Sequence, residues 1–287
     1  MLDQFRAELI RQGFSQNTVE AYTRNARLFT DWVQATMGEP FDNQISVFDG
    51  REYRGYLLNI KKLSPNSVNA KLQAVQRFAD FLASQGTQEP VKLGRQKVVA
   101  GTEVKVLDKA TLYKCRRWAA THASPRDAAI FELLLNTGLR ESELAALTLA
   151  DIQITERKGS LLVRNGKGGK SRTVPLNSDA RAALQRYIAV RPINSGDRVF
   201  YGQRGPLQRS AVYRVVNQIG RRGAGVENLS PHVLRHVMGT RLAKAGVDLT
   251  TIAALMGHSD PKTTARFYIA TTAEDRERAV DALVGDV

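Results

Sequence analysis

The chain has 287 residues, and 43 per cent of them are hydrophobic, which is enough to bury a core in one large domain or two ordinary ones. Lys and Arg number 42 against 28 Asp and Glu, so the net charge is +14. A folded chain this basic is expected to bind a polyanion, most often nucleic acid, although a basic protein without such a partner is the alternative. The single cysteine, Cys115, excludes an internal disulfide. We find neither a signal-like apolar N-terminus nor a run of about 18 apolar residues, so we expect a cytoplasmic protein with no membrane partner.

The first ninety residues show helical periodicity throughout. Two similar segments begin with a capping serine, Ser15 and Ser64, and continue with apolar residues at helical spacing. Residues 51–58 predict a further helix between them. Both serines precede polar, amide-rich helix starts, which can hold phosphates through free N–H groups, although chance similarity of two amphipathic helices is the alternative. The sequence predicts an all-helical domain over residues 1–90.

Residues 91–103 have little periodicity and contain glycine and several basic side chains. This composition is typical of a linker between domains. A basic linker is also suited to lie along a DNA backbone between two domains. We therefore predict a basic interdomain linker over 91–103 and a second domain over 104–287.

The second domain is predicted to be mixed. Residues 108–122 and 124–136 favour two helices, and Gly138 is expected to end the second one. L-L-V-R-N-G-K-G-G-K-S-R-T-V-P-L alternates apolar and polar residues on either side of a glycine-rich turn, which predicts a β-hairpin with Lys167 at its tip. From residue 179 onward the chain is again expected to be mostly helical.

The stretch S-P-H-V-L-R-H permits two kinds of site. His232 and His236 are four residues apart and could bind zinc, but Val233 stands where the metalloprotease pattern needs a glutamate, and Arg235 would repel the metal. The phosphate alternative fits better. If Ser230 caps a helix, the first turn presents free N–H groups that can bind a phosphate. His232 lies in that turn and shares a face with Arg235, three residues later. His236 is then expected to be a core residue or to support the site from behind.

Other polar residues fit a phosphate site, and each has an ordinary alternative. Arg140 follows the apolar run F-E-L-L-L, so its charge lies at the edge of the core and needs a partner. The partner is expected to be an acidic residue, Glu143 or Glu141, or else a substrate phosphate. Lys167, flanked by glycines, could reach a ligand or remain a surface lysine. Tyr268 could pack in the core, or its hydroxyl could attack phosphorus once the proton is removed.

Together these motifs resemble the tyrosine recombinase (phage integrase) family. The resemblance is carried by T-G-L-R-E-S-E-L, G-K-G-G-K-S-R-T-V-P-L, P-H-V-L-R-H and M-G-H-S-D-P-K-T-T followed by Tyr268, and it covers most of residues 104–275. The N-terminal part is similar to the family's core-binding domain. The resemblance implies a mainly α fold with a small β-sheet, in which an all-helical, SAM-like core-binding domain precedes an α+β catalytic domain.

The resemblance also implies roles for the residues that match the motifs. Tyr268 would attack a DNA phosphodiester to form a 3′-phosphotyrosyl link. Arg140 and Arg235 would hold the non-bridging oxygens, whose charge grows in the transition state. Lys167 would donate a proton to the leaving 5′-oxygen, with Lys170 as the less favoured alternative.

Three further residues complete the site that the resemblance implies. His232 would assist proton transfer, His258 would bind a phosphate oxygen, and Glu143 would support the first arginine. Family members need no metal, ATP or other cofactor. The expected partner is double-stranded DNA with an inverted-repeat core site, bound by a homo-tetramer that joins two duplexes through a Holliday junction.

The biological role stays open at this stage between integration, excision and resolution. The chain is similar to compact, two-domain Xer-like enzymes or to transposon and plasmid resolvases. Two other activities stay possible from the residues: DNA relaxation by a type IB topoisomerase, which uses the same chemistry, and DNA binding without catalysis. Every polar position of the site is filled, which disfavours the inactive alternative.

Overall fold

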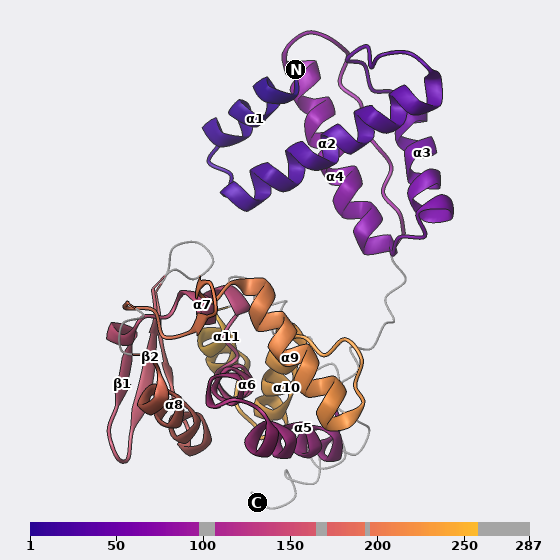
Figure 1. Cartoon of the computed structure of the whole chain (residues 1–287). Helices are drawn as coiled ribbons and strands as arrows, with labels where there is room; N and C mark the ends of the chain where they lie inside the picture. The colour runs from indigo at the N-terminus through magenta and orange to yellow at the C-terminus, as the bar shows by residue number, and fades with distance from the viewer. Residues whose placement is uncertain (98–106, 165–170, 193–195, 258–287) are drawn as a thin grey trace, which may run out of the picture. The chain divides into compact units, whose positions relative to one another are not determined.

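The computed structural model describes residues 1–97, 107–164, 171–192 and 196–257. The chain divides into two compact units after Thr102, and each has its own hydrophobic core (Figure 1). The units are mainly helical, with small sheets in the second, so the predicted fold class is confirmed. In the described ranges no helix is both long enough and apolar enough to cross a membrane.

The N-terminal unit is entirely helical in the part described. Its elements are α1 (Leu2–Arg11), α2 (Gln16–Met37), α3 (Val47–Gly55), the π-helical turn η1 (Tyr56–Ile60) and α4 (Pro65–Ser84). Ser15 and Ser64 cap α2 and α4 as predicted, and each hydroxyl accepts a backbone N–H three residues later at 3.3 Å. The helix predicted over 51–58 instead begins at Val47, because Ser46 and Asp49 form a capping box there.

The similarity between the two capped segments extends to their packing. Val19 and Phe29 of α2 are fully buried, and so are Val68 and Phe78 at the matching positions of α4. The two helices pack against each other (Figure 1). Their apolar faces therefore form the centre of the N-terminal core, while their capped starts remain exposed.

Residues 91–97, the first part of the predicted linker, lie along α4. Leu93 is buried in the N-terminal core, and its backbone N–H donates to Gln76 at 2.7 Å. The Asn69 side chain both donates to and accepts from the backbone of Gln96, each time at 2.8 Å. This stretch is therefore bound to the N-terminal unit, and residues 98–103 lie outside the described residues.

The second unit is built around one helix that is buried on every side. α6 (Pro125–Thr137) has apolar side chains around its circumference, which is the pattern of a fully buried helix. Its neighbours in space include α5, α8, α9 and α10 (Figure 1). The described helices besides α6 are α5 (Lys109–His122), α7 (Glu141–Ala146), η2 (Leu149–Asp151), α8 (Ser178–Val190), α9 (Arg209–Ala224), α10 (Pro231–Lys244) and α11 (Leu249–Met256).

A three-stranded antiparallel sheet lies beside these helices. The predicted hairpin is present as β2 (Gly159–Val163) and β3 (Arg172–Pro175), with Leu161 opposite Val174. Residues 165–170, which include Lys167, predicted to lie at the hairpin tip, are outside the described residues. Two features were not predicted: β1 (Ile152–Ile154), which pairs with β2, and a short ribbon of β4 (Tyr201–Gly202) and β5 (Gly205–Pro206).

The cysteine lies where α5 and α9 approach closely. Cys115 is fully buried, and burial raises the pKa of its thiol. A Cβ atom on Gly223 of α9 would lie 3.1 Å from the Cα of Cys115. Glycine at position 223 therefore permits the two helices to pack with their backbones nearly in contact.

Candidate active site

A sharp turn brings Arg140, the arginine of the T-G-L-R motif, to the edge of the core. α6 ends at Gly138, as predicted, in the left-handed conformation with φ of 60°. A Cβ at this glycine would lie 2.7 Å from the sulfur of Met238, so a larger residue would also meet α10. The turn leaves Leu139 buried and places Arg140, half-buried, directly before α7.

Glu143 is the anionic centre of the site. Its side-chain oxygens accept from the Arg140 guanidinium at 2.6 Å and from the Arg140 backbone N–H at 2.9 Å. Both oxygens also accept from the guanidinium of Arg172 in β3, at 3.0 and 2.8 Å. Of the two acidic partners considered for Arg140, Glu143 therefore forms the ion pair.

The ionisation of Glu143 is decided by competing effects. Burial alone would raise the pKa of this carboxyl, of which 7% is exposed. The hydrogen bonds from Arg172 and from the backbone of Arg140 outweigh burial and hold its pKa below the usual value. The carboxylate is therefore charged at neutral pH.

Three arginines converge on the C-terminal end of α11. The last carbonyls of a helix lack partners within it and carry a partial negative charge, which favours cations there. Three consecutive carbonyls are satisfied in this way: Leu255 accepts from Arg172 Nε at 2.9 Å, Met256 from Arg235, and Gly257 from Arg140 at 2.7 Å.

Arg235 is the most deeply buried of the three arginines. Only 5% of it is exposed, and it also donates to the carbonyl of Gly138. Burial and the neighbouring charge of Arg140 lower its pKa to about 10, so it remains protonated at neutral pH. The cluster contains three guanidinium groups but one carboxylate, Glu143, which pairs with Arg140 and Arg172, so positive charges exceed negative ones by two. This excess is suited to an anion that reaches the half-buried Arg140.

The helix that carries Arg235 begins as predicted. The Ser230 hydroxyl accepts from the backbone N–H of Val233 at 3.3 Å, and a proline occupies the first helical position. His232 is exposed in the first turn, one turn before Arg235. His236 is half-buried, and burial together with the charge of His232 lowers its pKa. Across the described ranges, no group of three or more His, Cys, Asp or Glu side chains is placed to hold a metal ion.

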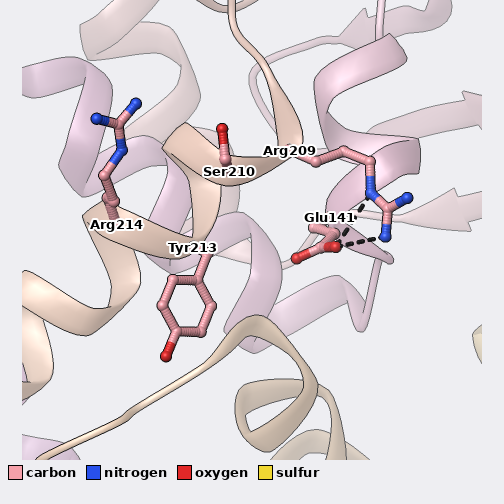
Figure 2. Close-up of a pocket in the computed structure, with 5 residues that line it drawn as sticks. All are labelled: Glu141, Arg209, Ser210, Tyr213 and Arg214. Carbon is pink, nitrogen blue, oxygen red and sulfur yellow. Dashed lines mark hydrogen bonds and ion pairs between the residues drawn. The ribbon is translucent and has the colours of Figure 1, made fainter. Parts of the chain in front are cut away.

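A shallow hollow lies between α7 and the start of α9. Figure 2 shows Glu141 and Arg209 pointing toward each other, with Nη2 and Nε of the arginine 2.6 and 3.0 Å from one carboxylate oxygen. Ser210, Tyr213 and Arg214 complete the lining, and Arg214 points away from the ion pair (Figure 2). Glu141 follows directly after the first arginine of the cluster in the chain. The hollow thus adds two exposed cationic side chains next to the cluster, of a kind that contacts phosphates.

The predicted site residues divide into two groups. The structure brings together Arg140, Glu143 and Arg235, and it places His232 on the same helix as Arg235. Lys167, His258 and Tyr268, which are the other predicted site residues, and the alternative Lys170 lie outside the described residues.

Arg172 is a member of the cluster that was not predicted. It lies in the R-T-V-P-L half of the hairpin, two residues before the buried Val174, so both side chains belong to the inward face of the strand. An arginine in an inward register needs a buried partner. That signal was present in the sequence, but the identity of the partner was not.

Comparison with known proteins decides the family. The model of the phage integrase family matches residues 105–275, and the model of the N-terminal SAM-like domain of phage integrases matches residues 2–86. The chain belongs to the phage integrase family. The predicted enzyme class, a site-specific tyrosine recombinase that cuts and rejoins DNA, is confirmed by this membership and by the relatives.

Relatives of this phage integrase family member match it over almost their whole length. Tyrosine recombinase XerC of Pelobacter propionicus is 31% identical, over 93% of the chain and 90% of the relative. TnP I resolvase of Bacillus thuringiensis is 29% identical, over 91% and 92%. Tyrosine recombinase XerA of Pyrococcus furiosus is 30% identical, over 98% and 93%. The predicted similarity to Xer enzymes and to a transposon-type resolvase is confirmed.

Solved structures agree on the fold. The Tn1549 transposon integrase in complex with transposon right-end DNA has a TM-score of 0.73 and 23% identity, covering 99% of both chains. The XerH site-specific recombinase bound to its difH substrate has a TM-score of 0.72 and 20% identity, covering 91% of this chain and 78% of that one. The helical unit and the catalytic unit therefore both have the architecture of this family.

Proposed function

We propose that this recombinase cuts and rejoins its target through a 3′-phosphotyrosyl intermediate at the arginine cluster described above. The observation that carries the proposal is the convergence of Arg140, Arg172 and Arg235 on the last carbonyls of α11, while the one carboxylate in the cluster, Glu143, pairs with only Arg140 and Arg172. Positive charge held in a partly buried place without full compensation is stabilised by an anion. A DNA phosphodiester supplies that anion.

Arg140 and Arg235 are the residues that hold the non-bridging phosphate oxygens in this proposal. The Arg140 side chain is 28% exposed, so solvent and ligand can reach it, and Glu143 fixes its position from behind. Charge on the phosphate oxygens grows as phosphorus becomes five-coordinate, and donors that are already fixed stabilise this charge without reorganising. Two guanidinium groups held by protein acceptors meet that requirement.

The covalent step is assigned by the sequence motifs. The Tyr268 oxygen forms a bond to phosphorus, and the bond from phosphorus to the 5′-oxygen breaks. Lys167 supplies the proton that the 5′-oxygen takes up, and His232 assists removal of the tyrosine proton. His258 donates a hydrogen bond to a phosphate oxygen. Attack by a 5′-hydroxyl of another strand reverses the step, so the bond energy is retained.

The assembly and the biological role are also part of the proposal. Four copies bind two duplexes that carry inverted-repeat core sites, and strands are exchanged through a Holliday junction in the cytoplasm. The role is resolution, excision or integration of a mobile element or of replicon dimers. The similarity to XerC enzymes and to TnP I resolvase over almost their full lengths supports this assignment.

Covalent trapping tests the proposal. The protein is mixed in EDTA with nicked duplexes taken from its native flanking DNA, and products are separated on a denaturing gel. We expect a shifted covalent band that Tyr268→Phe abolishes and that Tyr113→Phe, a change at an exposed tyrosine of α5, retains. A band that survives Tyr268→Phe would show that another residue is the nucleophile. Tight binding of the duplex with no band would contradict the catalytic assignment.

A further inference from the structure

The third arginine of the cluster, Arg172, has contacts that differ in kind from those of Arg140. We propose that Arg172 is a positioning residue of the recombination site: it holds Glu143 in the orientation that presents Arg140 to the phosphate, and it fixes the end of α11 against the same carboxylate. This inference rests on the proposed function, because it assigns a role within that site.

The geometry of Arg172 leaves little freedom. Nη1 and Nη2 donate to the two oxygens of Glu143 at 3.0 and 2.8 Å, in the paired geometry that orients a carboxylate most strongly. Nε donates to the carbonyl of Leu255 at 2.9 Å. The Arg172 side chain is 12% exposed, and that of Glu143 is 3% exposed. One planar group thus ties β3, α7 and α11 together.

These contacts explain why Arg172 acts on protein groups rather than on the phosphate. Each of its three nitrogens already donates to a protein oxygen. A Cβ at Gly257 would lie 2.6 Å from Nη1, so the backbone at the end of α11 packs directly on the guanidinium. Arg140, whose side chain is 28% exposed, is the member that faces solvent instead.

The consequence for Arg140 follows from the shared carboxylate. Arg140 makes one side-chain contact to Glu143, from Nη1 to Oε1 at 2.6 Å, while Oε2 accepts from Arg172 and from the Arg140 backbone. Without Arg172, Glu143 has lost its main side-chain donor, and the guanidinium of Arg140 is drawn further onto the carboxylate. The donors that Arg140 presents to a phosphate then turn away from it.

The position of α11 gives the second effect. Arg172, Arg235 and Arg140 bind the carbonyls at 255, 256 and 257 in that order, and the next residue in the chain is His258. Loss of the first of these three bonds loosens the end of the helix from the cluster. Misplacement of reacting groups by about 1 Å can cost about a hundredfold in rate.

The test separates DNA binding from the rate of cleavage. Arg172→Lys keeps the charge but not the paired geometry, and it is compared with wild type in two assays. These are the Kd for the site duplex by fluorescence anisotropy and the single-turnover rate of covalent complex formation at saturating nicked duplex. We expect a Kd within about threefold of wild type and a rate lower by about a hundredfold. Thermal melting of each variant ensures that the assays compare folded proteins.

A matched control exists in the same unit. Arg116 of α5 holds both oxygens of the buried Glu132, with Nε and Nη2 at 2.8 and 2.9 Å, so it also makes a two-bond pair with a carboxylate but away from the cluster. Arg116→Lys is expected to cleave at the wild-type rate. Wild-type cleavage by Arg172→Lys, or a lower affinity with an unchanged rate at saturation, would overturn the positioning role.

A double variant tests whether Arg172 acts through Glu143. If it does, the loss of cleavage rate in Glu143→Gln combined with Arg172→Lys is smaller than the product of the two single losses, because both substitutions disrupt the same contact between Arg172 and Glu143. Losses that multiply would overturn the proposed route. A wild-type covalent band that requires Tyr268 shows that the proposed function holds whatever Arg172 does. If wild type binds the duplex and forms no band, the proposed function fails and the positioning role fails with it.

Discussion

Replacement of Glu143 by glutamine removes the charge on which Arg140 and Arg172 converge, and its cost follows from burial. Breaking a buried ion pair on one side typically costs about 3–5 kcal/mol, because it leaves an uncompensated charge. Glutamine keeps one carbonyl oxygen as an acceptor, so we expect a loss of about 3 kcal/mol in the free energy of unfolding at pH 7. With a urea slope of about 2 kcal/mol per molar, the midpoint of the catalytic unit falls by about 1–2 M.

The same variant has a predicted pH dependence. The folded-state pKa of Glu143 is lowered, so its contribution to stability is fully present above the pKa of the unfolded chain, about 4.3, and is lost as the pH falls through the folded value. The difference between wild type and Glu143→Gln should be equal at pH 7 and pH 6 and should narrow below about pH 4.3. A midpoint shift under about 0.3 M at pH 7, or a difference that does not narrow in acid, would refute this reasoning.

Glu141 provides the control within the same helix. It pairs with Arg209 at 2.6 Å, the same distance as between Arg140 and Glu143, but 57% of the Arg209 side chain is exposed. Solvent screens such a pair, so Glu141→Gln should lower the free energy of unfolding by at most about 1 kcal/mol. A loss as large as that of Glu143→Gln would show that distance, and not burial, decides the energy here.

Two further outcomes are expected. Gly138→Ala should lower the free energy of unfolding of the catalytic unit by about 2 kcal/mol, because the residue has a positive φ and its new Cβ would lie 2.7 Å from the sulfur of Met238. Urea unfolding measures this loss, and an unchanged midpoint would contradict it. Affinity for the site duplex should fall steeply with salt, by about a thousandfold between about 50 and 200 mM if about six phosphates are neutralised; an affinity that does not change with salt would contradict a backbone-dominated interface.

Local signals predicted the helix ends well. Ser15, Ser64 and Ser230 each cap a helix, and Gly138 ends one, because a cap depends on side chains within a few residues of one another. The start of α3 was misplaced because Ser46 was not recognised as a cap. The short strands β1, β4 and β5 were missed, since strands of two or three residues carry too little periodicity to be seen.

The sequence predicted which residues belong to the candidate site better than it predicted their hydrogen-bond partners. The motifs pointed to Arg140, Glu143 and Arg235, but the carbonyls that hold the arginines belong to α11, about 115 residues after Arg140 in the chain. Backbone acceptors leave no mark in the sequence. Arg172 was missed because its partners, the Glu143 side chain of α7 and the Leu255 carbonyl of α11, are distant in the chain and only the fold brings them to β3.

The buried thiol of Cys115 gives this protein a built-in reporter of its own opening. The chain has one cysteine, which is fully buried, and burial raises its pKa. A thiol reagent can therefore reach it only when the core around it opens, and the rate of modification measures how often that happens. The labelling rate with and without a bound duplex would report how strongly DNA restrains the core of the catalytic unit, and no cysteine has to be introduced.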